Sequence, residues 1–214
     1  MTLEKVREIL INVEGWLIPK EVEFLYKQAH AVKGDGMIVE IGSYKGKSTI
    51  CLAAGSQEGS SVKVYAVDPH MTDLEQKLSN KSESSLNDFK RNIEYSKLGH
   101  LVEPIVEFSH DAVRNWNKPI EFLWIDGDHS YEGAKKDFDL WSPFLIDGGV
   151  VAFHDSYDVH VQKVLKECVF TSAHYSNSSI AGTIAFAQKK TGTISLAEKA
   201  KNRCVFCLIK CNRI

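Results

Sequence analysis

Apolar positions along this chain follow two periods, and the change from one to the other outlines the fold. Three-to-four spacing in LEKVREILINV and PKEVEFLYKQAHAV predicts two amphipathic helices, the second beginning at Pro19. Beyond them, short β-rich runs alternate with helical ones. Strands are expected at 37–41, 62–67, 102–107, 121–125, 149–153 and 182–189, and helices at 46–56, 84–97, 111–116, 131–145 and 156–169. This alternation is typical of βαβ units and predicts an α/β fold with a parallel sheet.

The length of the chain suits one such domain. A chain of 214 residues can build a full core for one α/β domain and is short for two. Residues 1–190 are therefore expected to form a single domain, in which the helices of residues 1–33 pack over the sheet or beside the mouth of the site. The polar stretch at 70–84 indicates either a mobile loop near the site or a disordered surface insertion.

Charge and hydropathy narrow the class of partner. A net charge of -2 gives no reason to expect nucleic acid or an anionic membrane as the main partner. The first apolar segment contains acids and lacks a small-residue cleavage site, so it does not read as a secretory signal. No apolar run reaches the ~20 residues of a membrane-spanning helix. We therefore expect a cytoplasmic protein without a membrane span.

Acids, histidines and small residues stand where the predicted strands end. They are Glu40 and Gly42 after the first strand, Asp68 after the second, Ser109 and His110 after the third, Asp126, Asp128 and His129 after the fourth, and His154 and Asp155 after the fifth. In an open parallel sheet the carboxyl ends of the strands share one edge, and ligands bind in the crevice there. The sequence therefore predicts that these groups converge on one site.

The segment VEIGSYKGKST leads from a strand through two glycines into a helix, which brings backbone amides close to a ligand. The stretch from Gly42 to Ser48 resembles a phosphate-binding P-loop, but three residues rather than four separate its glycines. A P-loop-like NTPase or kinase is thus one hypothesis, with EFLWID supplying a magnesium-binding acid. Glu40 beside the phosphates and Asp68 at the next strand end argue against it, since an acid there suits ribose hydroxyls. We favour a nucleoside ligand without phosphates.

Five segments together resemble the class I S-adenosylmethionine (SAM)-dependent methyltransferases. They are VEIGSYKGKST, VYAVD, FSHDA, FLWIDGDHSYEGAKKDFDLWSPFLIDGGVVAFHDS and GTIAFA, within residues 14–190. They are most similar to the small, often metal-dependent branch with the catechol and macrolide sugar O-methyltransferases. The resemblance implies a three-layer αβα sandwich around a Rossmann-like, doubly wound, mostly parallel seven-stranded sheet whose last strand is antiparallel.

The resemblance also implies positions for the cofactor. The methionine end of SAM is expected near the loop that follows the first strand, the ribose on Asp68, and the adenine near Ser109 and His110. The residues expected around the methionine end are Glu40, Gly42, Tyr44, Gly46 and Ser48. A sulfonium and an ammonium group favour a pocket lined by carboxylates over a phosphate cradle, which agrees with this placement.

Two carboxylates and an imidazole at adjacent strand ends, ~5 Å apart, could hold a divalent metal. In the similar metal-dependent enzymes, residues matching Asp126, His154 and Asp155 bind magnesium. The first member of the pair is usually an acid there, so His154 opens the choice among magnesium, manganese, zinc and no metal. His129 stands where the catechol enzyme has a basic lysine, and its imidazole could accept a proton from a substrate hydroxyl. We expect His129 and Asp126 to be catalytic.

Composition changes in the tail. Residues 191–214 are basic and contain Cys204, Cys207 and Cys211, for which no fourth metal ligand is evident. A metal or cluster site, a basic membrane anchor and a helix packed on a second subunit of a homodimer are the alternatives, and we favour the helix.

The sequence as a whole predicts a SAM-dependent methyltransferase. Its acceptor would be a small hydroxylated molecule, such as a sugar or polysaccharide precursor. A binding protein that kept the cofactor loop and lost its chemistry is a third hypothesis. The acid and histidine residues at the strand ends argue against it, because a binder has no need of them.

Overall fold

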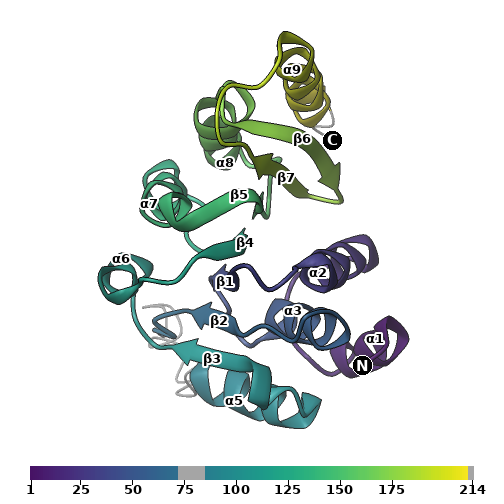
Figure 1. Ribbon diagram of the computed structural model, residues 1–214. Coiled ribbons are helices and arrows are strands. Elements are labelled where there is room, and N and C mark those ends of the chain that lie inside the picture. Colours follow the sequence, from purple (N-terminus) through teal and green to yellow (C-terminus); the bar gives the residue numbers. More distant parts are fainter. Residues whose placement is uncertain (72–84, 212–214) are drawn as a thin grey trace.

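The computed structural model describes residues 1–71 and 85–211, and the predicted loop at 70–84 therefore lies almost wholly outside the described residues. Seven strands form one sheet in the order β3-β2-β1-β4-β5-β7-β6 (Figure 1). The strands are β1 (Met37–Ile41), β2 (Val64–Val67), β3 (Val102–Ile105), β4 (Ile120–Ile125), β5 (Leu145–Phe153), β6 (Tyr175–Ala181) and β7 (Ile184–Lys189). The strands β1 to β5 pair in parallel, and β7 runs antiparallel to both β5 and β6. The predicted mostly parallel sheet with an antiparallel last strand is confirmed.

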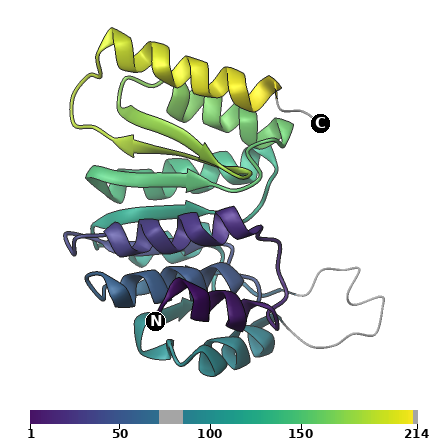
Figure 2. The same cartoon turned by 90° about the vertical axis from the view of Figure 1, so that its right-hand side faces the viewer.

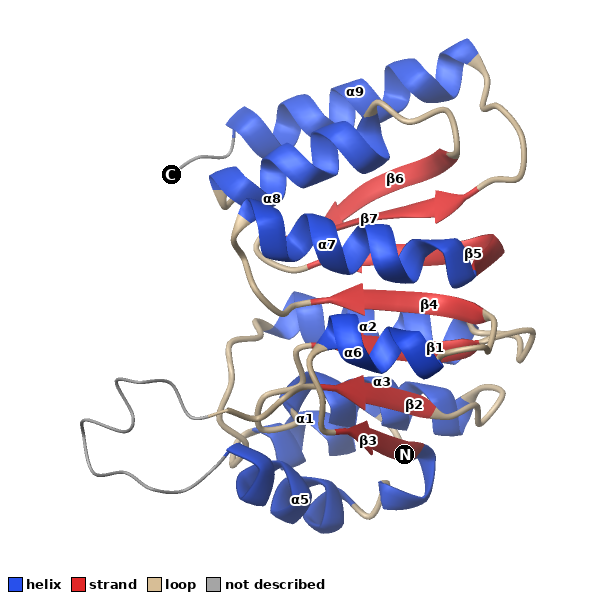
Figure 3. Ribbon diagram, turned by 90° about the vertical axis from the view of Figure 1, so that its left-hand side faces the viewer, coloured by secondary structure: helices blue, strands red, loops and turns tan. Residues whose placement is uncertain are grey.

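Helices cover both faces of the sheet and complete the three layers. On one face lie α1 (Leu3–Leu10), α2 (Pro19–Ala31), α3 (Lys47–Glu58) and α5 (Ser85–Ser96), with α1, α2 and α3 in front in Figure 2. On the other lie α6 (Ser109–Ala112), α7 (Tyr131–Trp141), α8 (Val159–Val164) and α9 (Leu196–Cys211); Figure 3 shows α6, α7 and α8 from this side and α9 at the end of the sheet beyond β6. A π-helical segment, Leu165–Phe170, continues α8.

The central strands have a hydrophobic core on each side, which explains their nearly continuous apolar sequences. Side chains of β1 and β4 alternate between the two cores: Ile38 and Phe122 face α2 and α3, whereas Val39 and Leu123 face α7 and α8. All four are fully buried or nearly so. Burial on both faces fixes the register of these strands, and hence the place where each of them ends.

Backbone hydrogen bonds between strand ends place the site residues in a row. Each residue just after a strand donates its N–H to the end of a neighbouring strand: Gly42 to Val67, Asp68 to Ile105, Asp126 to Ile41 and His154 to Ile125. The prediction that these groups converge on one edge of the sheet is therefore confirmed.

The predicted boundary between helix and strand near residue 145 was wrong, and one strand was missed. Strand β5 begins at Leu145, so helix α7 ends earlier than the predicted 145. Strand β6 was not predicted, because YSNSSIA lacks the apolar alternation typical of strands. Its buried side chains include Ser176 and Ser178, and the Ser178 hydroxyl donates to Asn202 of α9 at 2.7 Å. At Ser178, a hydrogen bond to a distant helix thus takes the place of hydrophobic contact.

The tail helix α9 packs on this chain's own sheet, whereas we expected a second subunit as its partner. Asn202 and Ile209 are fully buried, and the Asn202 amide donates to the Tyr175 carbonyl of β6 at 2.8 Å. The three cysteines of the tail are exposed on this helix. Among the described residues, no helix is both long and apolar enough to cross a membrane.

Candidate active site

One pocket of about 820 Å³ lies at the carboxyl edge of the sheet and brings together most of the predicted site residues. Eleven of them line it: Gly42, Tyr44, Ser48, Asp68, Ser109, His110, Asp126, Asp128, His129, His154 and Asp155. Glu40 and Gly46 do not. The pocket also includes the segment from Glu14 to Leu17, which precedes α2.

The glycine loop needs its glycines for space and for backbone conformation. Gly42 and Gly46 both have a φ of 87°, in the left-handed region that disfavours side chains. A Cβ on Gly42 would lie 2.2 Å from the Asp126 carbonyl oxygen. The end of β1 and the end of β4 can therefore lie side by side only because residue 42 has no side chain.

Asp68 organises the same loop. One oxygen of its carboxylate accepts the backbone N–H groups of Ser43 at 2.9 Å and Tyr44 at 2.8 Å, and the other accepts that of His70 at 2.7 Å. Asp68 lines the pocket, and its carboxylate has further lone pairs that could accept hydrogen bonds from a ligand. In a P-loop the amides of the loop bind phosphate. Here a carboxylate already occupies two of them.

Both lysines of the loop are likewise engaged. The Lys45 ammonium lies 2.6 Å from Glu14 and 2.9 Å from Asp88, and its hydrogen bond to Glu14 raises its pKa. Lys47 donates to the Gly15 carbonyl at 3.1 Å. These contacts tie the segment before α2 to the loop and leave neither ammonium directed at a phosphate. The P-loop hypothesis is therefore not supported.

Glu40 lies behind the pocket wall. It is fully buried, and it accepts hydrogen bonds from the hydroxyls of Ser48 and, at 2.5 Å, Thr49. Burial raises the pKa of Glu40 to about 8, because neither partner is a cation. Its effect on a ligand would pass through Ser48, which does line the pocket. Direct contact between Glu40 and a cofactor stays a prediction.

Aromatic rings stand at two places along the pocket. His110 stacks on Phe108, with centroids 5.4 Å apart, beside the predicted adenine position. Trp16 stacks on Tyr44 at 5.6 Å, although it is 76% exposed. The Ser109 hydroxyl donates to Asp137, a buried acid on α7 that the sequence did not single out.

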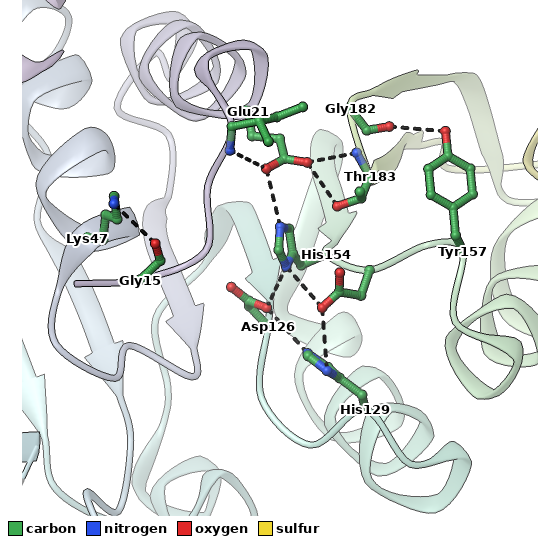
Figure 4. Close-up of polar contacts among 11 residues, drawn as sticks. Gly15, Glu21, Lys47, Asp126, His129, His154, Tyr157, Gly182 and Thr183 are labelled. Carbon is green, nitrogen blue, oxygen red and sulfur yellow. Dashed lines mark hydrogen bonds and ion pairs between the residues drawn. The ribbon is translucent and has the colours of Figure 1, made fainter. Parts of the chain in front are cut away.

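Four titratable side chains line the far end of the pocket, and Glu21 lies buried behind them; we call these five residues, Glu21, Asp126, His129, His154 and Asp155, the acid–histidine cluster (Figure 4). His154 lies at its centre. Its Nδ1 is 3.2 Å from Asp126 Oδ1 and 3.3 Å from Asp155 Oδ2, and its Nε2 is 3.5 Å from Glu21 Oε2. His129 spans the same two aspartates, with its Nε2 3.4 Å from Asp126 and its Nδ1 3.5 Å from Asp155.

The mutual contacts of the cluster shift its pKa values. Burial opposes the charged form of His154, but hydrogen bonds to Asp126, Asp155 and Glu21 raise its pKa to about 12. The hydrogen bond to Asp126 also raises the pKa of His129, and the contact with His154 lowers that of Asp155. Three carboxylates around one imidazole therefore favour a positive charge at this point, whether a proton or a metal ion supplies it.

Asp126, His154 and Asp155 suit a divalent metal in their donor atoms. One ligand atom from each lies within 4.8 Å of the others, and these are the three residues that we predicted from the sequence. Asp155 has a φ of 47°, a strained conformation of the kind that gathers at functional sites. The donor set of one imidazole nitrogen and two carboxylate oxygens fits such an ion.

Sequence reasoning missed Glu21, whereas it placed Asp128 at the edge where the site lies. Glu21 is separated from His154 by most of the chain, and its one local signal is its position in the first turn of α2, where acids are common. The cap of α7 is Ser130 rather than Asp128, whose carboxylate accepts the Ser130 N–H at 2.8 Å.

The comparisons with known proteins agree with this arrangement. A family model described as "methyltransferase domain" matches residues 39–156, from β1 to just past His154 and Asp155. That stretch is more than half of the chain and contains every predicted cofactor and metal residue. The chain therefore belongs to this methyltransferase family.

Two curated relatives share sequence with the chain. An uncharacterized protein of Acanthamoeba polyphaga mimivirus is 26% identical over 156 residues, which are 72% of this chain and 67% of that protein. An uncharacterized protein of Sinorhizobium fredii is 28% identical over 120 residues, which are 56% of this chain but only 13% of that protein.

Solved structures share the fold at low sequence identity. A cofactor-bound protein from MTB, Rv0187, has a TM-score of 0.65 and 16% identity, covering 89% of this chain and 90% of its own. An O-methyltransferase from Bacillus cereus in complex with SAH has a TM-score of 0.61 and 20% identity, covering 87% and 90%. TomG, an O-methyltransferase from Streptomyces achromogenes in complex with SAM, has a TM-score of 0.60 and 15% identity, covering 88% and 89%.

Proposed function

We propose that this chain is a SAM-dependent O-methyltransferase that acts on a small hydroxylated acceptor, with a sugar or polysaccharide precursor as the class to test first. The observation that carries the proposal is the division of one pocket into two ends. Asp68 and the glycine loop occupy one end, and the acid–histidine cluster occupies the other. Family membership and the SAM- and SAH-bound neighbours support the cofactor.

The residues of each end have separate tasks in this proposal. Bound SAM would supply an electrophilic methyl group, and a divalent ion would polarise the acceptor hydroxyl. The glycine loop and Asp68 would hold the nucleoside, and Asp126 with Asp155 would fix the direction of the hydroxyl. His129 would take the hydroxyl proton as the oxygen–carbon bond forms and the carbon–sulfur bond breaks. Alignment of the two reactants contributes much of the rate enhancement in such a displacement.

The test is calorimetric titration of the full chain with SAM, SAH and ATP–Mg²⁺, each with and without added divalent metal. Micromolar binding of SAM and SAH without binding of ATP supports the proposal and opens a screen of sugar and phenol acceptors. Binding of ATP alone would reject the methyltransferase assignment. Binding of SAH without turnover of any acceptor, in a screen that includes metal ions, would favour the non-catalytic hypothesis.

A further inference from the structure

The orientation of the His154 ring is fixed from three sides. Its side chain is 7% exposed, and it packs edge-on against Trp124 with centroids 5.6 Å apart. Nε2 points to Glu21, and Nδ1 points to the two aspartates (Figure 4). A ring held in this way cannot exchange its two nitrogens without losing its contact with Glu21 or with the aspartates.

Glu21 is itself held rigidly. Its Oε2 accepts the Ile18 N–H at 2.9 Å, and its Oε1 accepts the N–H of Thr183 at 2.7 Å and the Thr183 hydroxyl at 2.9 Å. The side chain is 2% exposed, and a Cβ on Gly182 would lie 2.6 Å from it. The turn between β6 and β7 and the start of α2 are thus built around this carboxylate. A buried carboxylate is costly to desolvate, which makes its place beside His154 a feature that needs explanation.

We propose that Glu21 is a positioning residue that directs Nδ1 of His154 toward Asp126 and Asp155, and that this nitrogen and the two carboxylates bind a first-row transition ion, represented by Zn²⁺, in preference to Mg²⁺. The inference rests on the proposed function only in placing the ion beside the acceptor. The inference adds two points: the site selects Zn²⁺ over Mg²⁺, and Glu21, which does not bind the ion itself, makes this selection possible.

The chemistry of the donors supports this preference. Imidazole nitrogen suits ions such as zinc, whereas magnesium prefers oxygen ligands and keeps its waters. A histidine that binds metal commonly donates its other ring N–H to a carboxylate, which fixes the tautomer and the ring orientation. Glu21 is that carboxylate here. Bonds of ~2.0–2.2 Å place neighbouring ligand atoms ~3 Å apart, which the contacts from His154 Nδ1 to Asp126 and Asp155 match.

The experiment is calorimetric titration of metal-free full-length protein with ZnCl₂ and with MgCl₂. Because the exposed thiols of α9 would also bind zinc, every protein carries Cys204→Ser, Cys207→Ser and Cys211→Ser. This background protein should bind one Zn²⁺ at least ~10-fold more tightly than Mg²⁺. Glu21→Gln should weaken Zn²⁺ binding by ~10–100-fold. Glu23→Gln, which neutralises an exposed acid on the same helix, should change neither affinity.

A second variant tests the donor itself and does not depend on how well Glu21→Gln folds. His154→Asp combined with Glu21→Gln gives three oxygen donors and keeps two carboxylates from facing each other in the core. This double variant should lose the preference for Zn²⁺. The proposal is overturned if the background protein binds no Zn²⁺, if the double variant keeps the preference, or if a folded Glu21→Gln binds Zn²⁺ as tightly as its parent.

Titration of the same samples with SAH separates the two proposals. SAH binding without selective Zn²⁺ binding leaves the methyltransferase function in place and rejects the ion. Selective Zn²⁺ binding without SAH binding does the reverse.

Discussion

The two ends of the pocket are built in different ways. At the glycine loop, a carboxylate is satisfied by backbone N–H groups from the end of the neighbouring strand, as Asp68 is by Ser43 and Tyr44, 25 and 24 positions away. In the acid–histidine cluster, side chains satisfy one another, and Glu21 reaches His154 across 133 positions of the chain. The glycine loop keeps its shape only while its backbone conformation is kept. The acid–histidine cluster is stable only while its negative and positive charges offset one another. Substitutions in the glycine loop should therefore act by changing backbone conformation, and substitutions in the acid–histidine cluster by changing electrostatic interactions.

The largest effect should come from Gly42, where the two ends touch. In Gly42→Ala the new methyl group would meet the Asp126 carbonyl at 2.2 Å, at a φ of 87°. We expect a loss of roughly 4 kcal/mol or more in the free energy of unfolding and a melting temperature lower by about 10 °C or more. Thermal unfolding measures this. Gly99→Ala is the control, since the nearest atom to its Cβ would be 3.8 Å away. Equal melting temperatures for the two variants would show that the close approach is not a constraint.

The next largest effect should be a loss of turnover without a loss of cofactor affinity. His129→Gln removes the predicted base from the acid–histidine cluster while the glycine loop stays intact. We expect kcat to fall by ~10²–10⁴-fold with SAH affinity within twofold of wild type, once an acceptor is known. Single-turnover rates and calorimetry separate the two quantities. A large loss of SAH affinity would mean that the two ends are coupled, and an unchanged kcat would reject His129 as the base.

The sequence predicted the parts of the fold that depend on local pattern, and it missed those that depend on contacts between distant parts of the chain. The five parallel strands, the edge on which their ends meet and the glycine loop were all predicted, because each depends on local pattern or on spacing within a few residues. Strand β6 was missed because its sequence lacks apolar alternation, and its buried Ser178 finds a hydrogen-bond partner only on α9, far along the chain. The boundaries near Leu145 were wrong although Pro143 follows the end of α7, because Asp147, Gly148 and Gly149 are typical of a turn but lie inside β5.

The candidate site divides in the same manner. Asp126, His154 and Asp155 could be grouped from the sequence, since adjacent parallel strands bring their ends together. Glu21 could not, because the contact depends on how α2 packs against the β6–β7 turn. Glu40 reads as a pocket acid from its position at a strand end, yet two hydroxyls from α3 enclose it. The side-chain direction at a strand end is set by tertiary packing rather than by the local motif.

A smaller effect should follow from changing the charge of Asp68. Asp68→Asn keeps one oxygen acceptor but must turn an amide N–H₂ either toward the backbone N–H groups of Ser43 and Tyr44 or toward that of His70. We expect SAH affinity to fall ~10–100-fold, because the variant loses a charge-assisted acceptor for the ribose and loosens the loop. Zn²⁺ affinity at the acid–histidine cluster should not change. Unchanged SAH affinity would reject the ribose assignment.

The smallest expected effect follows from a comparison of the pKa values of two buried glutamates. Glu40 and Glu21 are both almost completely buried, yet their pKa values shift in opposite directions. Burial raises the pKa of Glu40 to about 8, because its partners are two neutral hydroxyls. Burial acts on Glu21 in the same direction, but hydrogen bonds from His154, the Thr183 N–H and the Ile18 N–H outweigh it and lower the pKa.

The shift at Glu40 predicts a pH dependence of stability whose sign is fixed. Between pH 4.5, its ordinary pKa, and about 8, the unfolded chain has lost the Glu40 proton while the folded protein keeps it. Stability contributed by Glu40 is thus fully present below pH 4.5 and is lost as the pH rises to about 8, with the unfolding constant rising by up to about tenfold per pH unit. Glu40→Gln should remove this slope, and Glu103→Gln, at an exposed acid on β3, should keep it. Denaturant unfolding at half-unit pH intervals measures the difference between the variants. A slope that persists in Glu40→Gln would mean that Glu40 is ionised in the folded protein, and the glycine loop would then rest on a buried charge as the acid–histidine cluster does.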